Sequence, residues 1–322
     1  MTNYRWGIVG LGRIAHNFAK FFPEGQTLYG VAARDVDRAQ TFADEFAVPK
    51  VYPTYDALFA DPEIDIVYVA TTHNFHYANI KAALLAGKHV FAEKSITLNA
   101  RELSELITIA EQKHLILMEA QTIYHMPLYP ALDDAVADLG KLRTIQVSFG
   151  INATDPQDRL LNPDLAGGAL LDIGIYALSF VRRLMSASPK LVATQMTRSA
   201  TGVDDQSSFL LTNDHGEQAT VVLNLQAMMP KVGLAAYDHG FVQVPEYPRA
   251  DHATLAITGQ ELTTISAGDW HHTMAYEILD MAKAVETGDN PTLAWTYDTA
   301  VIMSQAREAW GFYYPNEQAP LV

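Results

Sequence analysis

The N-terminal segment runs from an apolar strand into a glycine-rich turn and then into a helix, and this order constrains the fold more than any other feature. The turn is Gly10-Leu11-Gly12-Arg13-Ile14-Ala15. Gly10 permits a tight turn, Gly12 lets a pyrophosphate approach the backbone, and Ala15 lets the helix pack closely on the strand. The helix N-terminus offers N–H groups and a partial positive charge to phosphates. The segment therefore predicts a dinucleotide site lined by Gly10, Leu11, Gly12, Arg13 and Ile14.

Short β-rich runs alternate with helical stretches through the first 120 residues. The expected strands are Arg5–Val9, Thr27–Ala33, Lys50–Tyr52, Ile64–Ala70, His89–Ala92 and Leu115–Glu119. The expected helices are Arg13–Phe21, Asp37–Phe46, Phe75–Ala86 and Ala100–Lys113. The strands are mostly apolar, which is typical of a parallel sheet covered by helices on both faces. Residues 1–121 are therefore predicted to form a Rossmann dinucleotide-binding domain with a doubly wound parallel sheet.

The pattern changes after residue 121. Helices are expected at Leu128–Leu139, Gly168–Met185, Thr273–Thr287 and Tyr297–Trp310. Strands are expected between residues 190 and 266, at Leu191–Met196, Ser208–Leu211, Thr220–Leu225, Phe241–Val244 and Ala253–Thr258. Successive strands without intervening helices predict a largely antiparallel open sheet. Residues 122–322 are thus predicted to form an α+β domain for substrate binding and oligomerisation. Because the second face of its sheet needs a cover, a homodimer or homotetramer through this sheet is expected.

Composition restricts the kinds of binding partner and the cellular compartment that are expected for this chain. The chain has 322 residues, of which 49% are hydrophobic and 18% charged, as is ordinary for a globular protein of two domains. Its formal net charge of −15 repels nucleic acid and anionic membrane surfaces. The absence of cysteine excludes disulfides and thiolate metal sites and is compatible with a reducing cytosol. With no leader and no apolar run of about 18 residues recognised, a soluble cytoplasmic protein is expected.

The residue that closes the second strand distinguishes the two nicotinamide dinucleotides. An acid there binds the ribose hydroxyls of NAD, whereas an arginine pairs with the 2′-phosphate of NADP. The strand is followed by Arg34 and Asp35, with Arg38 one helical turn further on. Arg34 and Arg38 favour NADP, and Asp35 leaves NAD as the alternative.

Two more loops fall at the carboxyl edge of the predicted parallel sheet, where open α/β folds bind ligands. Polar contacts with the cofactor are expected there from Thr71, Thr72, His73, His76, Glu93 and Lys94. Two histidines are too few for a zinc site, which needs at least three protein ligands, so no metal is predicted. Lys94 is either a solvated loop residue or a group that holds a substrate hydroxyl beside an acid.

A second cluster lies in the segment Gly167–Tyr176, of sequence GGALLDIGIY. Asp172 and Tyr176 are four residues apart, so they share one face if the segment is helical. An acid and a phenol among apolar neighbours need polar partners when they are buried. Either Asp172 caps a helix and Tyr176 fills core, or the pair faces a substrate.

Together these segments resemble the Gfo/Idh/MocA oxidoreductases, the family of glucose-fructose oxidoreductase and inositol dehydrogenase. The resemblance covers nearly the whole chain and rests on four motifs in the correct order, Gly10–Ala15, Ala86–Lys94, Gly167–Tyr176 and Trp310–Pro315. Within the family, the branch of dimeric dihydrodiol dehydrogenase and NADP-dependent xylose dehydrogenase is the most similar at Ala32–Asp35, Thr71–His76 and Leu171–Tyr176.

The resemblance implies a role for each reacting group. Lys94 matches the family's catalytic lysine, Tyr176 stands where this branch has a tyrosine and many members a histidine, and Asp172 matches the acid that orients the substrate. In oxidation, Tyr176 assisted by the Lys94 ammonium would take the hydroxyl proton while hydride passes to the nicotinamide. The implied function is NADP-dependent hydride transfer to or from a CH–OH group of a sugar, polyol or trans-dihydrodiol.

Two positions depart from the family pattern. Ser95 follows Lys94 where the family usually has a proline, often after a cis bond, which leaves a trans bond and a slightly displaced lysine open. Thr72 also stands where many members have proline. Three other functions stay open: an NAD-dependent inositol or sugar dehydrogenase, a non-catalytic NADP-binding sensor or regulator, and cofactor-assisted glycoside hydrolysis. The loop Asn152–Arg159, with His271 and His272, is expected to line the substrate pocket.

Overall fold

The computed structural model describes residues 1–153, 155, 158–315 and 317–322, which form two compact units. The first unit comprises Met1–Gln121 and Met274–Leu293, and the second comprises Thr122–Thr273 and Ala294–Val322. A segment from late in the sequence therefore belongs to the N-terminal unit. Of the loop expected to line the substrate pocket, Thr154, Pro156 and Gln157 lie outside the described residues.

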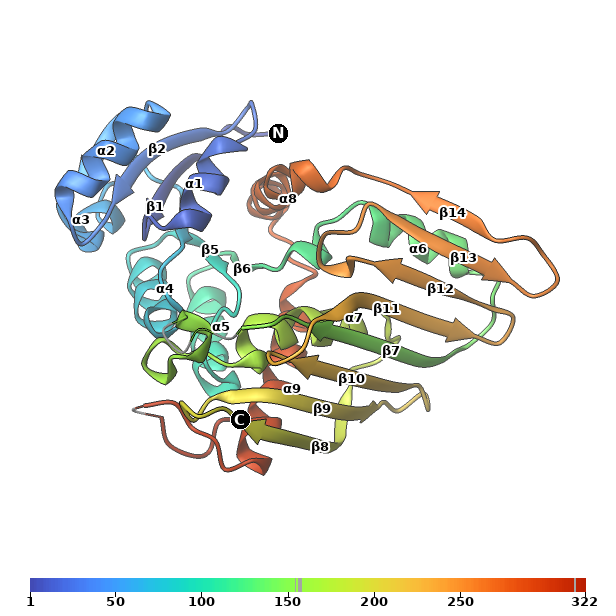
Figure 1. Ribbon diagram of the computed structural model, residues 1–322. Coiled ribbons are helices and arrows are strands. Elements are labelled where there is room, and N and C mark those ends of the chain that lie inside the picture. Colours follow the sequence, from blue (N-terminus) through green and yellow to red (C-terminus); the bar gives the residue numbers. More distant parts are fainter. Residues whose placement is uncertain (154, 156–157, 316) are drawn as a thin grey trace. The chain divides into compact units, whose positions relative to one another are not determined.

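The first unit is built on a parallel sheet of order β3-β2-β1-β4-β5-β6, the doubly wound order predicted (Figure 1). Its strands are β1 (Arg5–Val9), β2 (Thr27–Ala32), β3 (Lys50–Tyr52), β4 (Ile66–Val69), β5 (His89–Glu93) and β6 (Leu117–Ala120). Its helices are α1 (Arg13–Lys20), α2 (Val36–Phe46), α3 (Tyr55–Phe59), α4 (His76–Leu85), α5 (Ala100–Gln112) and α8 (Thr273–Thr287). Only α3 was not expected, because five residues carry too little periodicity to identify a helix.

One face of this sheet is covered by α1, α2 and α8. Phe18 of α1 stacks on Tyr68 of β4 with ring centroids 3.8 Å apart, and Trp6 of β1 packs beside them. Ile278 and Met281 of α8 join the same fully buried cluster. The segment Met274–Leu293 thus completes a hydrophobic core that the first 121 residues leave open.

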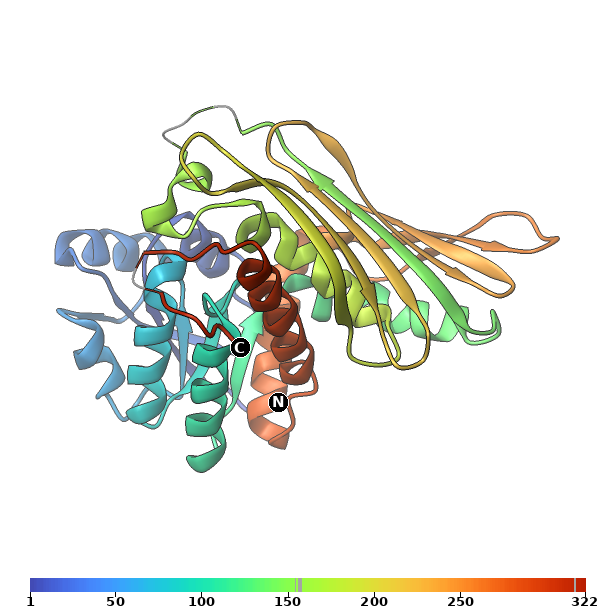
Figure 2. The same cartoon turned by 90° about the horizontal axis from the view of Figure 1, so that it is seen from below.

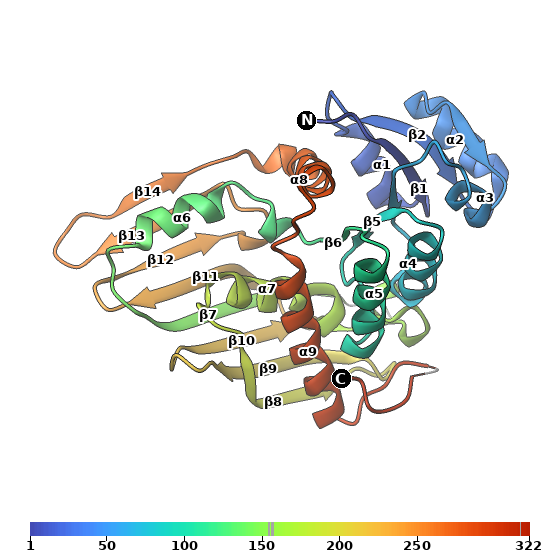
Figure 3. The same ribbon diagram turned by 180° about the vertical axis from the view of Figure 1, so that it is seen from behind.

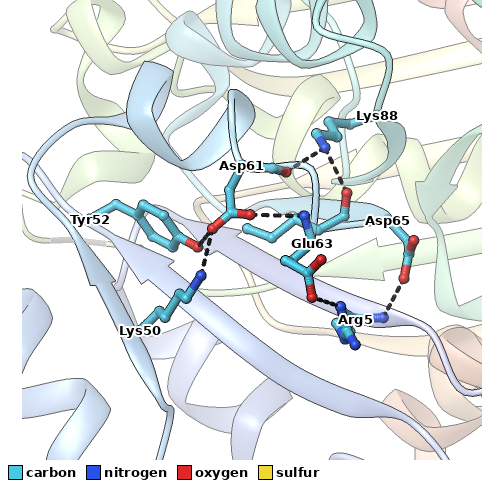
Figure 4. Close-up of polar contacts among 8 residues, drawn as sticks. Arg5, Lys50, Tyr52, Asp61, Glu63, Asp65 and Lys88 are labelled. Atoms are coloured by element: carbon cyan, nitrogen blue, oxygen red, sulfur yellow. Dashed lines mark hydrogen bonds and ion pairs between the residues drawn. The ribbon is translucent and has the colours of Figure 1, made fainter.

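The amino ends of the strands are held by a network of charged side chains, drawn in Figure 4. The buried Lys88 donates from Nζ to the carbonyl oxygens of Asp61, at 2.6 Å, and of Ile64, at 2.7 Å. Asp61 Oδ2 accepts from the Tyr52 hydroxyl at 2.5 Å and from Lys50 Nζ at 2.9 Å. Hydrogen bonding, above all from Tyr52, lowers the pKa of Asp61 to about 2. This network fixes the loop before β4 at the edge opposite the carboxyl ends.

The second unit is built on an eight-stranded sheet of order β14-β13-β12-β11-β7-β10-β9-β8 (Figure 3). Its strands are β7 (Leu142–Gly150), β8 (Lys190–Arg198), β9 (Asp204–Thr212), β10 (Gln218–Asn224), β11 (Met229–Tyr237), β12 (Gly240–Pro245), β13 (His252–Ile257) and β14 (Thr263–Ser266). Neighbours are antiparallel except β7 and β10, which are parallel. Figure 2 shows α6 (Leu128–Val136) and α7 (Ile175–Leu184) on one face of this sheet. Helix α9 (Leu293–Ala309) is the last helix.

Three of these strands, β7, β11 and β14, were not predicted. β11 contains Pro230 and Gly233, residue types that are depleted in strands. Gly233 is nevertheless required, because the Phe180 ring of α7 occupies the space where a Cβ would lie. β7 does alternate, with Ile145 and Val147 buried beneath the helices, and the sequence reading missed this period of two.

One helical stretch, Pro163–Leu184, is long and apolar enough to cross a membrane by length and composition, contrary to the expectation that no such run exists. Of the apolar window within this stretch, 78% is buried inside the protein. The α7 part packs against β7, β10 and β11. These contacts are typical of a core helix in a globular domain.

Candidate active site

The glycine-rich turn has the geometry of a phosphate cradle. Gly10 has a φ of +89°, and a Cβ on it would lie 2.7 Å from the Ala70 carbonyl carbon and the Thr71 nitrogen, so only glycine fits. A Cβ on Gly12 would meet nothing within 4 Å. Gly12 is the N-cap of α1, and no side chain caps that helix among the described residues. The turn therefore presents open backbone and helix N–H groups, as a dinucleotide pyrophosphate requires.

Two arginines follow β2 in the chain, Arg34 in the loop after the strand and Arg38 in α2. Arg38 Nη2 donates to the Leu11 carbonyl oxygen at 2.6 Å. The exposed Arg34 guanidinium lies 5.9 Å from the centre of the Phe75 ring. Asp35 is the N-cap of α2, and its Oδ1 accepts from the Asp37 backbone N–H at 3.0 Å. The Asp35 carboxylate thus caps a helix, and the Arg38 guanidinium lies at the glycine-rich turn.

The predicted loops at the carboxyl edge are joined by two histidines. His73 Nε2 lies 3.1 Å from the backbone oxygen of Lys94. The His76 ring lies between two backbone oxygens, with Nδ1 2.9 Å from that of Ser95 and Nε2 2.9 Å from that of Thr71. Burial lowers the pKa of His76, so its ring is neutral at pH 7 and one nitrogen at a time donates. The histidines therefore hold the backbone on which Lys94 is carried.

The Lys94–Ser95 peptide bond is cis. The sequence left a trans bond open at this position because Ser95 replaces proline, and the structure decides that question. The backbone after the bond is held by Glu119, which is buried and accepts the Ile96 N–H on Oε1 at 3.0 Å. Before the bond, Glu93 Oε1 accepts the Tyr68 hydroxyl at 2.5 Å. Lys94 therefore emerges from a loop anchored on both sides.

No group of three or more His, Asp or Glu side chains is arranged to hold a metal ion in the part of the chain that the structure describes. In the loops above, the imidazoles of His73 and His76 bond to backbone oxygens instead.

In the second unit, Asp172 and Tyr176 lie on one continuous helical stretch, but its winding differs from the expected α-helix. Leu170–Gly174 forms a π-helix, and Tyr176 is the second residue of α7. Such π turns occur often at functional sites. Asp172 Oδ1 accepts from Arg159 Nη2 at 2.8 Å, and the Asp172 side chain is 13% exposed. The pair gives this largely buried carboxylate a compensating charge.

Two residues that the sequence analysis did not identify hold the turn before this π-helix. Asp204 Oδ2 accepts the Leu170 backbone N–H at 2.7 Å. The Tyr314 hydroxyl donates to the Gly167 carbonyl oxygen at 2.6 Å. The consecutive glycines were the available signal, since they indicate a tight turn, but nothing in one sequence identifies which distant side chains contact it.

The structure thus groups the predicted residues into two sets. The glycine turn, the arginines and the Lys94 loop belong to the first unit, at the carboxyl edge where parallel sheets bind ligands. Asp172 and Tyr176 belong to the second.

Comparison with known proteins shows to which class of protein the chain belongs. Residues 4–121 match the sequence model for "Oxidoreductase family, NAD-binding Rossmann fold", and residues 134–241 match that for the GFO/IDH/MocA C-terminal domain. The fold and the dinucleotide cradle therefore define an NAD(P)-binding oxidoreductase. The chain belongs to the Gfo/Idh/MocA oxidoreductase family.

Similar proteins cover most or nearly all of its length. Trans-1,2-dihydrobenzene-1,2-diol dehydrogenase of Sus scrofa is 31% identical over 333 residues, covering 98% of this chain and 99% of that protein. The Homo sapiens protein of the same name is 34% identical over 247 residues, 74% of each chain. The 3-ketoreductase KijD10 of Actinomadura kijaniata, crystallised with NADP and TDP-benzene, has a TM-score of 0.85 and 25% identity, covering 95% of this chain and 98% of that one.

Proposed function

We propose that this protein is an NADP-dependent dehydrogenase that acts on the CH–OH group of a sugar, a polyol or a trans-dihydrodiol. The observation that carries the proposal is the anchored Lys94 loop, whose backbone is hydrogen-bonded by His73 at the edge where the dinucleotide cradle opens. A nucleotide sensor needs the cradle but has no use for a fixed lysine beside it. The relatives named as diol dehydrogenases and as a ketoreductase act between alcohols and carbonyls, which supports the same substrate class.

We assign the dinucleotide to the first unit and the substrate-orienting groups to the second. Gly10, Leu11, Gly12, Arg13 and Ile14 would hold the pyrophosphate by backbone N–H groups. Contacts to the rest of the cofactor are proposed for Thr71, Thr72, His73, His76, Glu93 and Lys94. The nicotinamide supplies the hydride acceptor when bound.

NADP is preferred over NAD in this proposal because of the two arginines. Arg38 is held at the turn by its bond to Leu11, and Arg34 is exposed and adjacent. A 2′-phosphate is the group that paired guanidinium donors bind best. The capping role of Asp35 weakens the case for an NAD ribose contact.

In the proposed oxidation, Tyr176 as its phenolate would take the proton of the reacting hydroxyl as the hydride passes to the nicotinamide, and Lys94 would stabilise the negative charge on the oxygens involved. Asp172 accepts a hydrogen bond from a second substrate hydroxyl, and its ion pair with Arg159 holds its carboxylate in place. These roles follow the family resemblance at each residue.

We also propose that the open face of the second sheet forms a homodimer or homotetramer interface. A row of hydrogen-bonded neighbours crosses that face, and none of its members is charged: Ala193, Leu210, Thr220, Gln146, Leu234, Gln243 and Thr254. A chain of net charge −15 with an uncharged, partly apolar sheet face has a surface suited to a second copy. Exposed Leu210 and Val222 lie on it.

Sedimentation tests this interface directly. Wild-type protein is expected to sediment as a dimer or tetramer and Val222→Lys as a monomer, while Leu85→Lys, at an exposed position on α4 of the first unit, serves as the control. A monomeric wild type would end the proposal. The soluble, cytoplasmic setting is likewise a proposal, supported by the cysteine-free composition.

A substrate panel tests the function. Sugars, polyols and trans-dihydrodiols are offered with NADP and with NAD, and nicotinamide reduction is followed by absorbance. Turnover of at least one alcohol, faster with NADP, is expected. Turnover with NAD alone favours the inositol or sugar dehydrogenase alternative, and tight NADP binding without turnover favours a sensor.

A further inference from the structure

We propose that Asp204 and Tyr314 together clamp the turn Gly167–Leu170 and thereby position Asp172 and Tyr176. The inference rests on the proposed function, since that function assigns the chemistry to Asp172 and Tyr176. Neither clamp residue touches the reacting atoms in this account, so both are positioning residues.

The first half of the clamp is a carboxyl group at the start of a helix. Asp204 is the first residue of β9 and has no exposed surface. Its Oδ2 accepts the Leu170 N–H at 2.7 Å, at the first residue of the π-helix. Carboxylates are stabilising at helix N-termini, where N–H groups have no partner within the helix. Asp204 therefore caps, from a distant strand, the helix that carries both proposed catalytic side chains.

Gly168 shows how closely the two segments fit. Its φ is +126°, and a Cβ on it would collide with Asp204 Oδ1. Only glycine both adopts this backbone conformation and admits the carboxyl group. The turn and Asp204 are thus matched in shape as well as in hydrogen bonding.

The second half of the clamp comes from the C-terminal segment. The buried Tyr314 donates its hydroxyl to the Gly167 oxygen at 2.6 Å. The Arg307 guanidinium lies 4.4 Å from the centre of the Tyr314 ring, and Arg307 pairs with Glu317. Glu317 in turn accepts the Tyr314 N–H at 2.8 Å. These contacts fix the ring, so its hydroxyl holds the turn at a defined position.

The charges around Asp204 make the clamp sensitive to pH. Arg307 of α9 faces it and favours ionisation, while the neighbouring Asp205 opposes it. Tyr314, in the C-terminal segment, adjoins Asp204. Burial, with smaller effects of the nearby Glu317 and Asp172 carboxylates, raises the pKa of the Tyr314 hydroxyl. Burial raises the pKa of Asp204 to about 7. Because an ionised carboxylate is the stronger acceptor, the clamp tightens as pH rises through neutrality.

The test compares two clamp variants with a matched control in the full chain. Asp204→Asn removes the charge, and Tyr314→Phe removes only a hydroxyl. Asp205→Asn is the control, because Asp205 is a neighbouring buried carboxylate that accepts from Thr197, at 2.7 Å, and Gln226, at 3.1 Å, instead of the turn. The clamp variants are expected to lose about ten- to a hundredfold in kcat with the Kd for NADP unchanged, and the control to keep kcat.

The dependence of kcat on pH distinguishes a positioning role of the Asp204 charge from a purely structural one. Wild-type kcat is expected to rise between about pH 6 and pH 8, and Asp204→Asn to rise less over that range because it lacks the ionisation of Asp204. Parallel profiles would contradict the role of the Asp204 charge.

Amide hydrogen exchange measures the clamp without any turnover. Peptides covering residues 167–176 are expected to exchange faster in both clamp variants than in wild type or Asp205→Asn. Folded clamp variants with wild-type exchange and wild-type kcat would overturn the inference. A wild type that turns over no alcohol would overturn the proposed function instead, and faster exchange in the clamp variants would still establish the clamp.

Discussion

His73 Nε2 lies 3.1 Å from the backbone oxygen of Lys94, so a side chain from the loop after β4 fixes the loop after β5. His73 therefore supports the backbone that carries the Lys94 side chain. An imidazole used in this way orients the residue that it supports without taking part in proton transfer.

Replacing His73 should therefore reduce turnover more than cofactor affinity. In His73→Ala we expect kcat to fall by about tenfold or more, because the Lys94 backbone loses its hydrogen bond and the ammonium its fixed position. The Kd for NADP, measured by fluorescence titration, is expected to change less. His252→Ala, at an exposed position on β13, is the control. Wild-type turnover in His73→Ala would show that the bond is dispensable.

Arg34 should control the choice of dinucleotide. Arg34→Ala is expected to weaken NADP binding by about ten- to a hundredfold, since a charge-assisted hydrogen bond contributes about 1.5 to 3 kcal/mol, and to leave NAD binding nearly unchanged. Isothermal titration with both nucleotides provides the measurement, and Arg101→Ala on α5 is the control. An equal loss for NADP and NAD would argue against a 2′-phosphate contact.

Much of the fold was predictable because local signals agree with it. The strands β1, β2 and β3 lie at or within a residue of their expected bounds, and apolar runs bounded by turns indicated the parallel sheet. β11 could not be predicted in this way, because Gly233 and Pro230 are residue types that are rare in strands. Gly233 is needed because the Phe180 ring, 53 positions earlier in the sequence, occupies the space of its Cβ. Tertiary packing, invisible in a local window, decided that element.

The residues of the candidate site show the same contrast between local motifs and long-range contacts. The turn Gly10–Ala15 has a local motif, and Gly10 has the positive φ that a tight turn allows to glycine. The contacts of Asp204 with Leu170 and of Tyr314 with Gly167 join residues far apart in sequence, and they carry no motif. A buried acid at the start of a strand looks, in sequence, like any exposed one.

Asp204 should give the folded protein a distinctive pH dependence. Its pKa is raised from 3.8 to about 7 by burial, so between these values the folded state retains a proton that the unfolded chain has lost. The free energy of unfolding should fall as pH rises from about 4 to 7, by roughly 2 to 4 kcal/mol for this group. Urea denaturation of wild type and Asp204→Asn across that range measures the slope. Two parallel curves would refute the assignment.

Lys88 should matter for stability and not for turnover. Lys88→Met leaves the Asp61 and Ile64 carbonyl oxygens without their buried donor, at a cost of about 2 to 3 kcal/mol. Thermal unfolding is expected to show a lower Tm, while kcat and the Kd for NADP stay at wild-type values because the network lies at the opposite edge of the sheet. A loss of kcat without a lower Tm would contradict the assignment of Lys88 to stability.

The most direct test of the catalytic assignment is kcat measured together with the Kd for NADP in Lys94→Ala and Tyr176→Phe, on an alcohol found by the substrate panel. Tyr313→Phe, which removes a partly exposed hydroxyl elsewhere, serves as the control. We expect kcat to fall by about 10² to 10⁴ in both site variants, with NADP binding retained. Tyr176→Phe loses the group that takes the proton, and Lys94→Ala loses the group that stabilises the negative charge. Wild-type kcat in either variant would contradict the assignment.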